Sequence, residues 1–543
     1  MLRLQLILCS TVLFALVAHS AQTVKLDAGT FTGTTNGTVS KFLGIPFGKS
    51  TAPPGRFSRP RLVDPYTGVH NATAFGPSCP QQDVTSGLVL PTTFPQATVD
   101  ALVAFVSQIV ITGPTSEDCL TINVFAPAGV NSNSKLPVVA WVFGGGFQVG
   151  GTVNYDGSAI VSRSIALNQP IIFVSMNYRL AAWGFIGGAE VNKAGLANLG
   201  LRDQRLALQW IQKYISAFGG DPTKVTMWGE SAGSIAVSLQ LLTNGGNSGG
   251  LYRGAFLESG SPYPVGNATA AQPSYDNLVA DTGCARASDT LKCLANLPLA
   301  NLTAAVNLSP NFFQTQVLAW SPRVDGDFLP DTPYKLITAG QVAQVHIVSG
   351  DCDDEGTSFS LGFSNITTEA GFEAFMSANE FPAASSAAIK NVAALYPANP
   401  AAGSPFDTGS ANALWNQFKR ISALQGDYAF QSTRRFLLNN VASRQKVFSY
   451  LTKRNKSVPF LGSSHGSDLP LFFVAGELQD YLIQFVTELD PNHQSTLPNW
   501  PQYTVTNPAL LTLWDGPPRV NITQDTFRAA AINEVTALVS QKI

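Results

Sequence analysis

The chain has 543 residues, of which 45% are hydrophobic and 13% are charged. Such a chain can bury a large core, so its composition excludes an intrinsically disordered protein and predicts a compact globular one. The formal net charge of −2 is too small to indicate nucleic acid or an anionic membrane as a partner.

Residues 1–21 have the pattern of a secretory signal peptide. Arg3 precedes an apolar run from Leu4 to Ala18, and Ser20 and Ala21 supply small residues for cleavage. An N-terminal membrane anchor is the alternative, but the apolar run is short for a helix that spans a bilayer. No later segment is long and apolar enough to cross a membrane, so residues 22–543 are predicted to be secreted and extracellular.

Eight Asn-x-Ser/Thr sequons fit passage through a eukaryotic secretory pathway. A single sequon is weak evidence, whereas eight together with a signal peptide favour a glycoprotein. They begin at Asn36, Asn71, Asn267, Asn301, Asn307, Asn365, Asn455 and Asn521.

Five of the six cysteines lie outside the predicted signal peptide. In an oxidising compartment, pairing between sequence neighbours favours Cys79 with Cys119 and Cys284 with Cys293. Cys352 is then left as a single thiol.

The order of apolar segments predicts the fold class. Residues 23–26, 31–32 and 39–46 indicate short strands separated by glycine-containing turns, an antiparallel entry to a sheet. The following apolar runs lack alternation, which is typical of parallel strands covered on both faces, and a helical pattern falls at residues 201–216. These runs and later strand candidates are residues 136–143, 171–176, 225–228, 255–257, 345–348 and 447–450. Strands alternating with helices predict an α/β fold with a large, mostly parallel sheet, and the absence of repeats or linkers favours one domain over residues 22–543.

A candidate nucleophile follows one of these buried strands. Gly229-Glu230-Ser231-Ala232-Gly233 has the Gly-x-Ser-x-Gly form, after the strand at 225–228 and before a helical pattern at 235–242. The glycines are needed because the serine occupies a strained turn where flanking side chains would collide with the neighbouring strand or helix. An ordinary strand-to-helix turn is the alternative.

A serine hydroxyl needs a base, and in this arrangement the acid and then the histidine follow it in the chain. His465, in a loop of small residues after the strand at 447–450, is favoured over His493, which has the surroundings of an exposed turn. The acid should follow the strand at 345–348, where Asp351, Asp353, Asp354 and Glu355 all remain candidates. A solvated acidic loop or a metal-binding turn is the alternative there.

A glycine loop follows the strand at 136–143. The backbone N–H groups of Gly144-Gly145-Gly146-Phe147, with that of Ala232, could converge on the oxyanion of a tetrahedral intermediate. A phosphate-binding loop is disfavoured because no Gly-Lys-Ser/Thr follows.

Several motifs together resemble the type-B carboxylesterase/lipase family, the cholinesterase-like α/β-hydrolases, and within it the secreted fungal lipases and sterol esterases. They are Glu117-Asp118-Cys119-Leu120-Thr121-Ile122-Asn123-Val124, Asn177-Tyr178-Arg179, Phe218-Gly219-Gly220-Asp221-Pro222 leading to Gly229-Glu230-Ser231-Ala232-Gly233, and Asp354-Glu355-Gly356. The resemblance covers nearly the whole mature chain and implies an α/β-hydrolase fold and a serine esterase that needs no cofactor or metal.

Carried over by position, the resemblance implies Ser231 as nucleophile, His465 as base and Glu355 as acid. It also implies Gly145, Gly146 and Ala232 as oxyanion donors. The family's disulfides map onto the two pairs favoured above, whereas Cys352 departs from the family pattern.

The resemblance also bears on the substrate. In fungal lipases of this family, the loop between the first two cysteines forms a lid, which here is residues 80–118. Val99, Leu102, Val103, Val106 and Val110 recur in it at helical spacing, which suggests an apolar helix that opens on a lipid surface or one that packs permanently on the body.

We expect lipophilic esters, such as triglyceride, sterol or long-chain esters, with Phe147 and Phe359 in the acyl pocket. A feruloyl-type or general short-chain carboxylesterase is the alternative. A non-catalytic binding protein of cholinesterase-like fold is disfavoured because the serine, acid and histidine are all present, and a serine peptidase is disfavoured by the resemblance. No motif indicates an oligomeric state.

Overall fold

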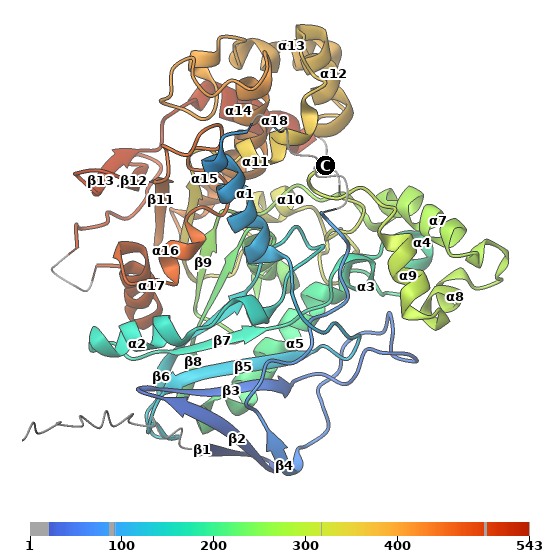
Figure 1. The fold of residues 1–543 in the computed structure, drawn as a ribbon, viewed down its shortest axis with the longest axis vertical. Helices are drawn as coiled ribbons and strands as arrows, with labels where there is room; N and C mark the ends of the chain where they lie inside the picture. Colours follow the sequence, from blue (N-terminus) through green and yellow to red (C-terminus); the bar gives the residue numbers. More distant parts are fainter. Residues whose placement is uncertain (1–20, 86–91, 93, 316–317, 493–496, 542–543) are drawn as a thin grey trace, which may run out of the picture.

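The computed structural model describes residues 21–85, 92, 94–315, 318–492 and 497–541, which are drawn in colour in Figure 1. Most of the predicted signal peptide therefore lies outside the described residues, and Ala21 begins the first strand. His493 also lies outside them. None of the helices within the described ranges has the length and apolar character needed to cross a membrane.

The described part of the chain contains one sheet of thirteen strands. Its strands are β1 (Ala21–Leu26), β2 (Ala28–Asn36), β3 (Val39–Pro46), β4 (Thr67–Asn71), β5 (Thr121–Pro127), β6 (Leu136–Val142), β7 (Ile172–Met176), β8 (Gly220–Glu230), β9 (Gly254–Glu258), β10 (His346–Cys352), β11 (Val447–Lys453), β12 (Ala509–Trp514) and β13 (Val520–Gln524). The spatial order is β1-β2-β3-β5-β7-β6-β8-β9-β10-β11-β12-β13, and β4 pairs with β2.

Helices cover the sheet (Figure 1). They are α1 (Gln96–Ile109), α2 (Ser158–Ala166), α3 (Ala181–Phe185), α4 (Ala189–Lys193), α5 (Leu199–Tyr214), α6 (Ala232–Gln240), α7 (Gln272–Asp281), α8 (Thr290–Asn296), α9 (Leu299–Val306), α10 (Pro333–Thr338), α11 (Thr357–Ser360), α12 (Glu369–Phe375), α13 (Ser386–Leu395), α14 (Phe418–Gly426), α15 (Ser432–Val441), α16 (Leu469–Phe472), α17 (Glu477–Glu488) and α18 (Ala529–Gln541).

The prediction of a large, mostly parallel sheet is confirmed. From β7 to β12 in spatial order, neighbouring strands are parallel. The other pairs are antiparallel, except that β4 pairs with β2 in parallel. The unalternated apolar runs form β6, β7 and β8, whose central residues are buried because helices cover both faces. Sequence reasoning missed β4, β5, β12 and β13 as strands.

The carboxyl ends of the parallel strands meet at one edge of the sheet. β8 ends at Glu230, directly beside Glu258 at the end of β9. β10 ends at Cys352, three residues before Glu355. In such sheets, ligands bind beyond the carboxyl ends of the strands, so this topology brings the predicted nucleophile and acid to the same edge.

Both predicted disulfides are present. Cys79 pairs with Cys119 and Cys284 with Cys293, while Cys352 is a buried free thiol. The first pair closes the segment that carries α1. Cys79 and Cys119 both lie in loops, whereas Cys284 begins a 3-10 turn and Cys293 lies in α8.

The sequons differ in exposure, and their occupancy stays a prediction. Six of the asparagines are exposed, whereas Asn307 and Asn455 are only partly so. The Asn455 Nδ2 atom, to which a glycan would be attached, also donates to the Ser467 carbonyl over 3.3 Å. Asn455 is therefore the sequon least suited to glycosylation.

The two disulfides should contribute unequally to stability. They close loops with sequence separations of 40 and 9 residues, and the chain-entropy model assigns about 4 and about 3 kcal/mol to loops of these lengths. The paired replacement of Cys79 and Cys119 by serine should therefore lower the urea midpoint more than the same change at Cys284 and Cys293. An equal or larger loss for the shorter loop would contradict this loop-entropy account.

Candidate active site

Ser231 occupies a sharp turn between β8 and α6. Its φ of 54° and ψ of −127° lie where non-glycine residues are rare. The flanking glycines make the turn sterically possible. A Cβ atom at Gly229 would lie 2.5 Å from the carbonyl carbon of Gly233, and one at Gly233 would lie 2.0 Å from the Val142 oxygen. The serine side chain is thereby held out from the strand edge.

The structure brings Ser231, His465 and Glu355 together. His465 Nε2 lies 2.8 Å from Ser231 Oγ, and His465 Nδ1 lies 2.6 Å from Glu355 Oε2. We place the imidazole proton on Nδ1, because a carboxylate accepts and does not donate. Nε2 is then free to accept the serine proton, the geometry of a nucleophile, a base and an orienting acid.

Glu355 is held by further hydrogen bonds. The Ser259 hydroxyl donates to Oε1 over 2.7 Å, and the Cys352 N–H donates to the same oxygen over 2.6 Å. Burial raises the pKa of Glu355, whereas these two donors act against that shift because they stabilise the ionised carboxylate. Both also fix the direction in which the carboxyl group faces His465.

Asp354 joins the loop of the acid to the loop of the histidine. The Asp354 N–H donates to the Ser463 carbonyl, and the Ser463 N–H donates to Oδ2 of the Asp354 side chain, each over 2.9 Å. The Lys456 ammonium and the Phe406 N–H also donate to the Asp354 carboxyl group. Asp354 directly precedes Glu355, and Ser463 lies two residues before His465. Their pairing therefore sets the spacing between the acid and the histidine.

The four acids that sequence reasoning left open take different positions. Asp351 pairs with Arg434, and Asp353 pairs with lysines near the end of β11. Asp354 joins the two loops as described. Of these four, Glu355 is the one in contact with His465, so its choice over its neighbours agrees with the geometry.

The glycine loop after β6 packs against the serine turn. A Cβ at Gly144 would lie 2.8 Å from the Ser231 Cβ, and a Cβ at Gly146 would lie 2.5 Å from Phe312. Gly145 and Gly146 have φ values of 104° and 63°, which favour glycine. Ala232 is the first residue of α6, where a backbone N–H lacks an intrahelical partner. This arrangement is suited to an anion beside Ser231.

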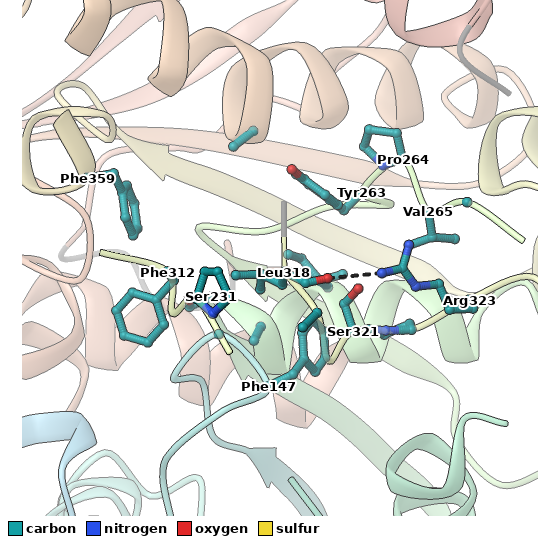
Figure 2. A pocket seen from close by; sticks show the side chains of 18 of the residues that line it. Phe147, Ser231, Tyr263, Pro264, Val265, Phe312, Leu318, Ser321, Arg323 and Phe359 are labelled. Atoms are coloured by element: carbon teal, nitrogen blue, oxygen red, sulfur yellow. Dashed lines mark hydrogen bonds between the residues drawn. The ribbon is translucent and has the colours of Figure 1, made fainter. Parts of the chain in front are cut away.

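A cavity of about 830 Å³ opens from Ser231, within the size range of pockets for small-molecule ligands. Figure 2 shows Phe147, Phe312 and Phe359 around Ser231. Most of its lining is apolar, including both residues predicted for the acyl pocket, Phe147 and Phe359. Phe147 packs on Phe185, with 4.9 Å between ring centroids.

Three phenylalanine rings surround His465. The ring centroids of Phe430, Phe359 and Phe105 lie 4.7, 5.1 and 6.1 Å from that of the imidazole. Phe105 belongs to α1, so the predicted helix between Cys79 and Cys119 reaches the site. The apolar enclosure lowers the local dielectric and strengthens the hydrogen bonds of the histidine.

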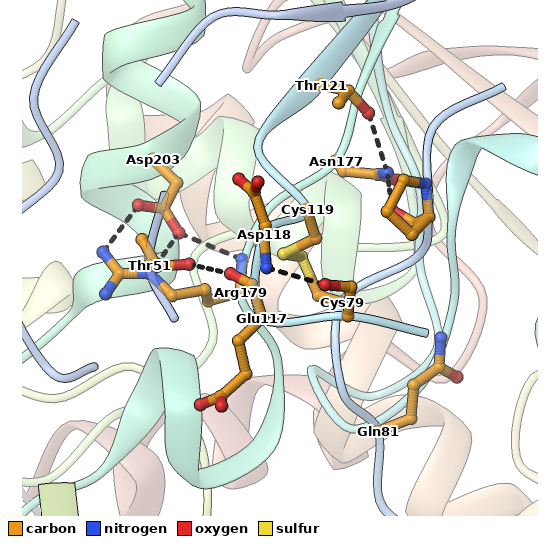
Figure 3. Close-up of a disulfide and its surroundings, with 12 residues drawn as sticks. Thr51, Cys79, Gln81, Glu117, Asp118, Cys119, Thr121, Asn177, Arg179 and Asp203 are labelled. Carbon is orange, nitrogen blue, oxygen red and sulfur yellow. Dashed lines mark hydrogen bonds and ion pairs between the residues drawn. A yellow bond between two sulfur atoms is a disulfide. The ribbon is translucent and has the colours of Figure 1, made fainter. Parts of the chain in front are cut away.

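The base of the α1 segment is firmly attached (Figure 3). The Cys79–Cys119 disulfide closes it, and the Thr51 hydroxyl donates to the Glu117 carbonyl. Close by, Arg179 forms a buried ion pair with Asp203 over 2.7 Å. Residues 86–91 and 93 of the predicted lid segment lie outside the described residues.

Glu230 is a functional candidate that sequence reasoning passed over. Its Oε1 lies 3.5 Å from His465 Nε2. Burial raises the pKa of Glu230 to about 8 and lowers the pKa of His465 below its usual 6.5. Near neutral pH, both groups are therefore uncharged and do not form an ion pair. Its position beside Ser231 in the sequence was the signal that could have identified it.

Other contributors had no sequence signal. Phe105, Phe312 and Phe430 come from segments far apart in the chain, and Ser259 follows β9. Among the described residues, no group of three or more His, Cys, Asp or Glu side chains is arranged to hold a metal ion.

Comparisons with known proteins agree with one another. A family model described as "Carboxylesterase family" matches residues 20–529. "Lipase 2" of Diutina rugosa is 40% identical over 92% of each chain. "Secreted lipase 1" of Botryotinia fuckeliana (strain B05.10) is 40% identical over 89% of this chain and 87% of its own.

Two further matches extend the comparison. "Secreted triacylglycerol lipase LIP1" of Gibberella zeae is 37% identical over 89% of this chain and 84% of its own. The crystal structure of Aspergillus niger EstA superposes with a TM-score of 0.81 and 26% identity, over 96% of this chain and 99% of that one. Together with the parallel sheet and flanking helices, this match identifies the α/β-hydrolase fold.

The two shifted pKa values predict how the reactivity of Ser231 depends on pH. The rate of its phosphonylation by an electrophilic phosphonate should stay high down to about pH 6.5 and fall only below it, because the depressed pKa of His465 keeps the imidazole neutral. A second inflection near pH 8 should reflect ionisation of Glu230.

The Glu230→Gln variant provides the matched control. Glutamine does not ionise, so the upper inflection should disappear while the acid limb remains. Persistence of the inflection near pH 8 in this variant would assign it to another group.

Proposed function

Because the chain belongs to the carboxylesterase family and is a carboxylic ester hydrolase, we propose that Ser231, His465 and Glu355 form its catalytic triad. The observation that carries this proposal is the pair of hydrogen bonds, 2.8 and 2.6 Å long, that His465 makes to Ser231 and Glu355. We further propose that hydrolysis proceeds through an acyl-enzyme.

In the proposed first step, Ser231 Oγ attacks the ester carbonyl carbon while His465 Nε2 takes its proton. Glu355 stabilises the resulting imidazolium through Nδ1–H. The N–H groups of Gly145, Gly146 and Ala232 stabilise the oxyanion, and one such donor typically contributes about 3 kcal/mol to the barrier reduction. The imidazolium then protonates the departing alcohol, which leaves an ester of Ser231.

In the second step, His465 removes a proton from water, which attacks the acyl carbonyl. Collapse of this second tetrahedral intermediate returns the proton to Ser231 Oγ and releases the carboxylic acid. In both steps His465 carries the proton that is transferred, and the proposal requires no cofactor.

We propose lipophilic esters as the substrate class, with triglycerides, sterol esters and long-chain esters as the candidates. The support is the apolar lining of the cavity and the contact of Phe105 and Ile109 with it. The relatives named as lipases are consistent with this choice.

We also propose that α1 acts as a lid over the cavity. On the side of α1 that faces the protein, Phe105 contacts His465 and Leu102 is buried. Val103 lies on the opposite side and is 58% exposed. The disulfide at the base allows the helix to move without detaching the segment. Secretion is part of the same proposal, supported by the signal-like N-terminus and the relatives named as secreted.

Replacement of the nucleophile tests the triad. Ser231→Ala should lower kcat/KM for a dissolved 4-nitrophenyl ester by roughly 10⁴-fold or more, since loss of a triad nucleophile removes the acyl-enzyme route. Ser238→Ala, in the helix that follows Ser231, is the matched control because the Ser238 hydroxyl donates to the Ile235 carbonyl within the helix and has no other side-chain partner among the described residues. If Ser231→Ala kept the activity of the wild type, the triad proposal would be wrong.

A comparison of substrate phases tests the lid. The rate on an emulsified long-chain triglyceride should rise sharply once the ester exceeds its solubility. Phe105→Ala should raise the rate on dissolved ester, because it removes the contact between α1 and His465. Val103→Ala, on the exposed side, should not. The absence of any gain at the interface would instead favour a permanently packed helix.

A further inference from the structure

The lining of the cavity at Ser231 includes one permanently cationic side chain. Among the described lining residues, Arg323 is the only arginine or lysine, and Glu230 is the only acid. Arg323 lines the cavity with Ser321, Val265 and Pro264 (Figure 2). A charged group in an otherwise apolar cavity is costly unless something compensates the charge.

The backbone of Arg323 is fixed on both sides. The Asn198 side chain accepts from the Arg323 N–H over 2.9 Å and donates to the Arg323 carbonyl over 2.7 Å. Val324 N–H donates to the Gly266 carbonyl over 2.9 Å. The backbone that carries the guanidinium is therefore held by the fold.

The guanidinium itself keeps unused donors. Nη2 donates to the Leu318 carbonyl over 2.9 Å, whereas Nε is buried and has no hydrogen-bond partner among the described residues. No carboxylate of the described residues forms an ion pair with it. By contrast, the deeply buried Arg179 and Arg434 both have aspartate partners. Arg205 and Arg253 also lack a carboxylate but do not line the cavity.

Several polar residues line the same cavity as Arg323. Ser321, and Ser274 and Asn277 from α7, line the same cavity. Burial lowers the pKa of Arg323, and the nearby Tyr263 hydroxyl acts in the opposite direction. An arginine remains protonated at neutral pH in proteins, so this part of the cavity presents a positive charge with donors around it.

We propose that Arg323 binds a carboxylate carried by the ester substrate at a position remote from the bond that is cleaved. The planar guanidinium matches a carboxylate in shape and charge. Among the lipophilic esters proposed above, the preferred ones are then those that also carry a carboxylate, either as half-esters of long dicarboxylic acids or on the alcohol part. This inference rests on the proposed function, because it requires the ester to reach Ser231 in the same cavity.

Matched substrates test this directly. We would compare 4-nitrophenyl esters of dicarboxylic acids, over increasing chain length, with methyl-terminated esters of equal length. At the matching length, the wild type should prefer the carboxylated ester. Arg323→Met should lower the ratio of the two kcat/KM values by about tenfold or more, the usual size of a lost charged hydrogen bond. Arg323→Lys should retain part of the preference.

Two controls separate the explanations. Arg253→Met removes a partly buried arginine outside the cavity and should leave the ratio unchanged. Because the result is a ratio, a general loss of folded protein in one variant cancels. A parallel series with the carboxyl group in the alcohol part shows which half of the ester faces Arg323.

Failure of the inference differs from failure of the proposed function. If the wild type hydrolyses the neutral esters but disfavours the carboxylated ester at every chain length in both series, Arg323 does not bind a substrate carboxylate. An unchanged ratio in Arg323→Met leads to the same conclusion. If the wild type hydrolyses neither kind of ester, the proposed function itself is wrong.

Discussion

The hydrogen bond between His465 Nε2 and Ser231 Oγ joins two residues 234 positions apart in the chain, and the arrangement of the site depends on it. The sheet topology places Ser231, which follows β8, at the same edge as the end of β10, which leads to Glu355. His465 lies in a loop beyond β11. Ser463 of that loop donates a hydrogen bond to Asp354, the neighbour of Glu355 in the chain. A shift of either loop would lengthen a bond that must be about 3 Å for proton transfer.

Close packing is the condition under which this geometry persists. Two chain segments, residues 142–144 and 229–233, meet at Ser231 so tightly that Gly144, Gly229 and Gly233 have no room for a Cβ atom. The strain of the serine turn is therefore held by backbone contacts on several sides. Aromatic rings then exclude water from the histidine, which strengthens its hydrogen bonds and shifts the neighbouring pKa values of Glu230 and His465 in opposite directions.

The sequence predicted the parts of the molecule whose signals are local. Buried parallel strands such as β6 and β8 have continuous apolar runs, and a strained serine turn requires glycines in fixed places. Edge strands have weaker signals, which is why β13, with its half-buried Val520–Gln524, was missed. The acid could not be chosen among four neighbours from chemistry alone, because loop geometry decides which side chain faces His465.

Features that form only when distant segments of the chain come together have no local pattern in the sequence. The rings of Phe105 and Phe430 meet His465 only after folding, and the isolation of Arg323 from carboxylates is a property of the cavity. Asp354 illustrates the limit well, since it was considered as a catalytic acid and instead accepts hydrogen bonds that join two loops.

The central claim is that Ser231 carries the acyl group during ester hydrolysis. Rapid acid quenching of the protein during turnover of a slowly deacylated ester, followed by peptide mass spectrometry, measures this directly. The account predicts the mass of one acyl group on the peptide that contains Ser231, and its absence in His465→Ala. An acyl group on a different residue, or turnover without any acylated peptide, would contradict it.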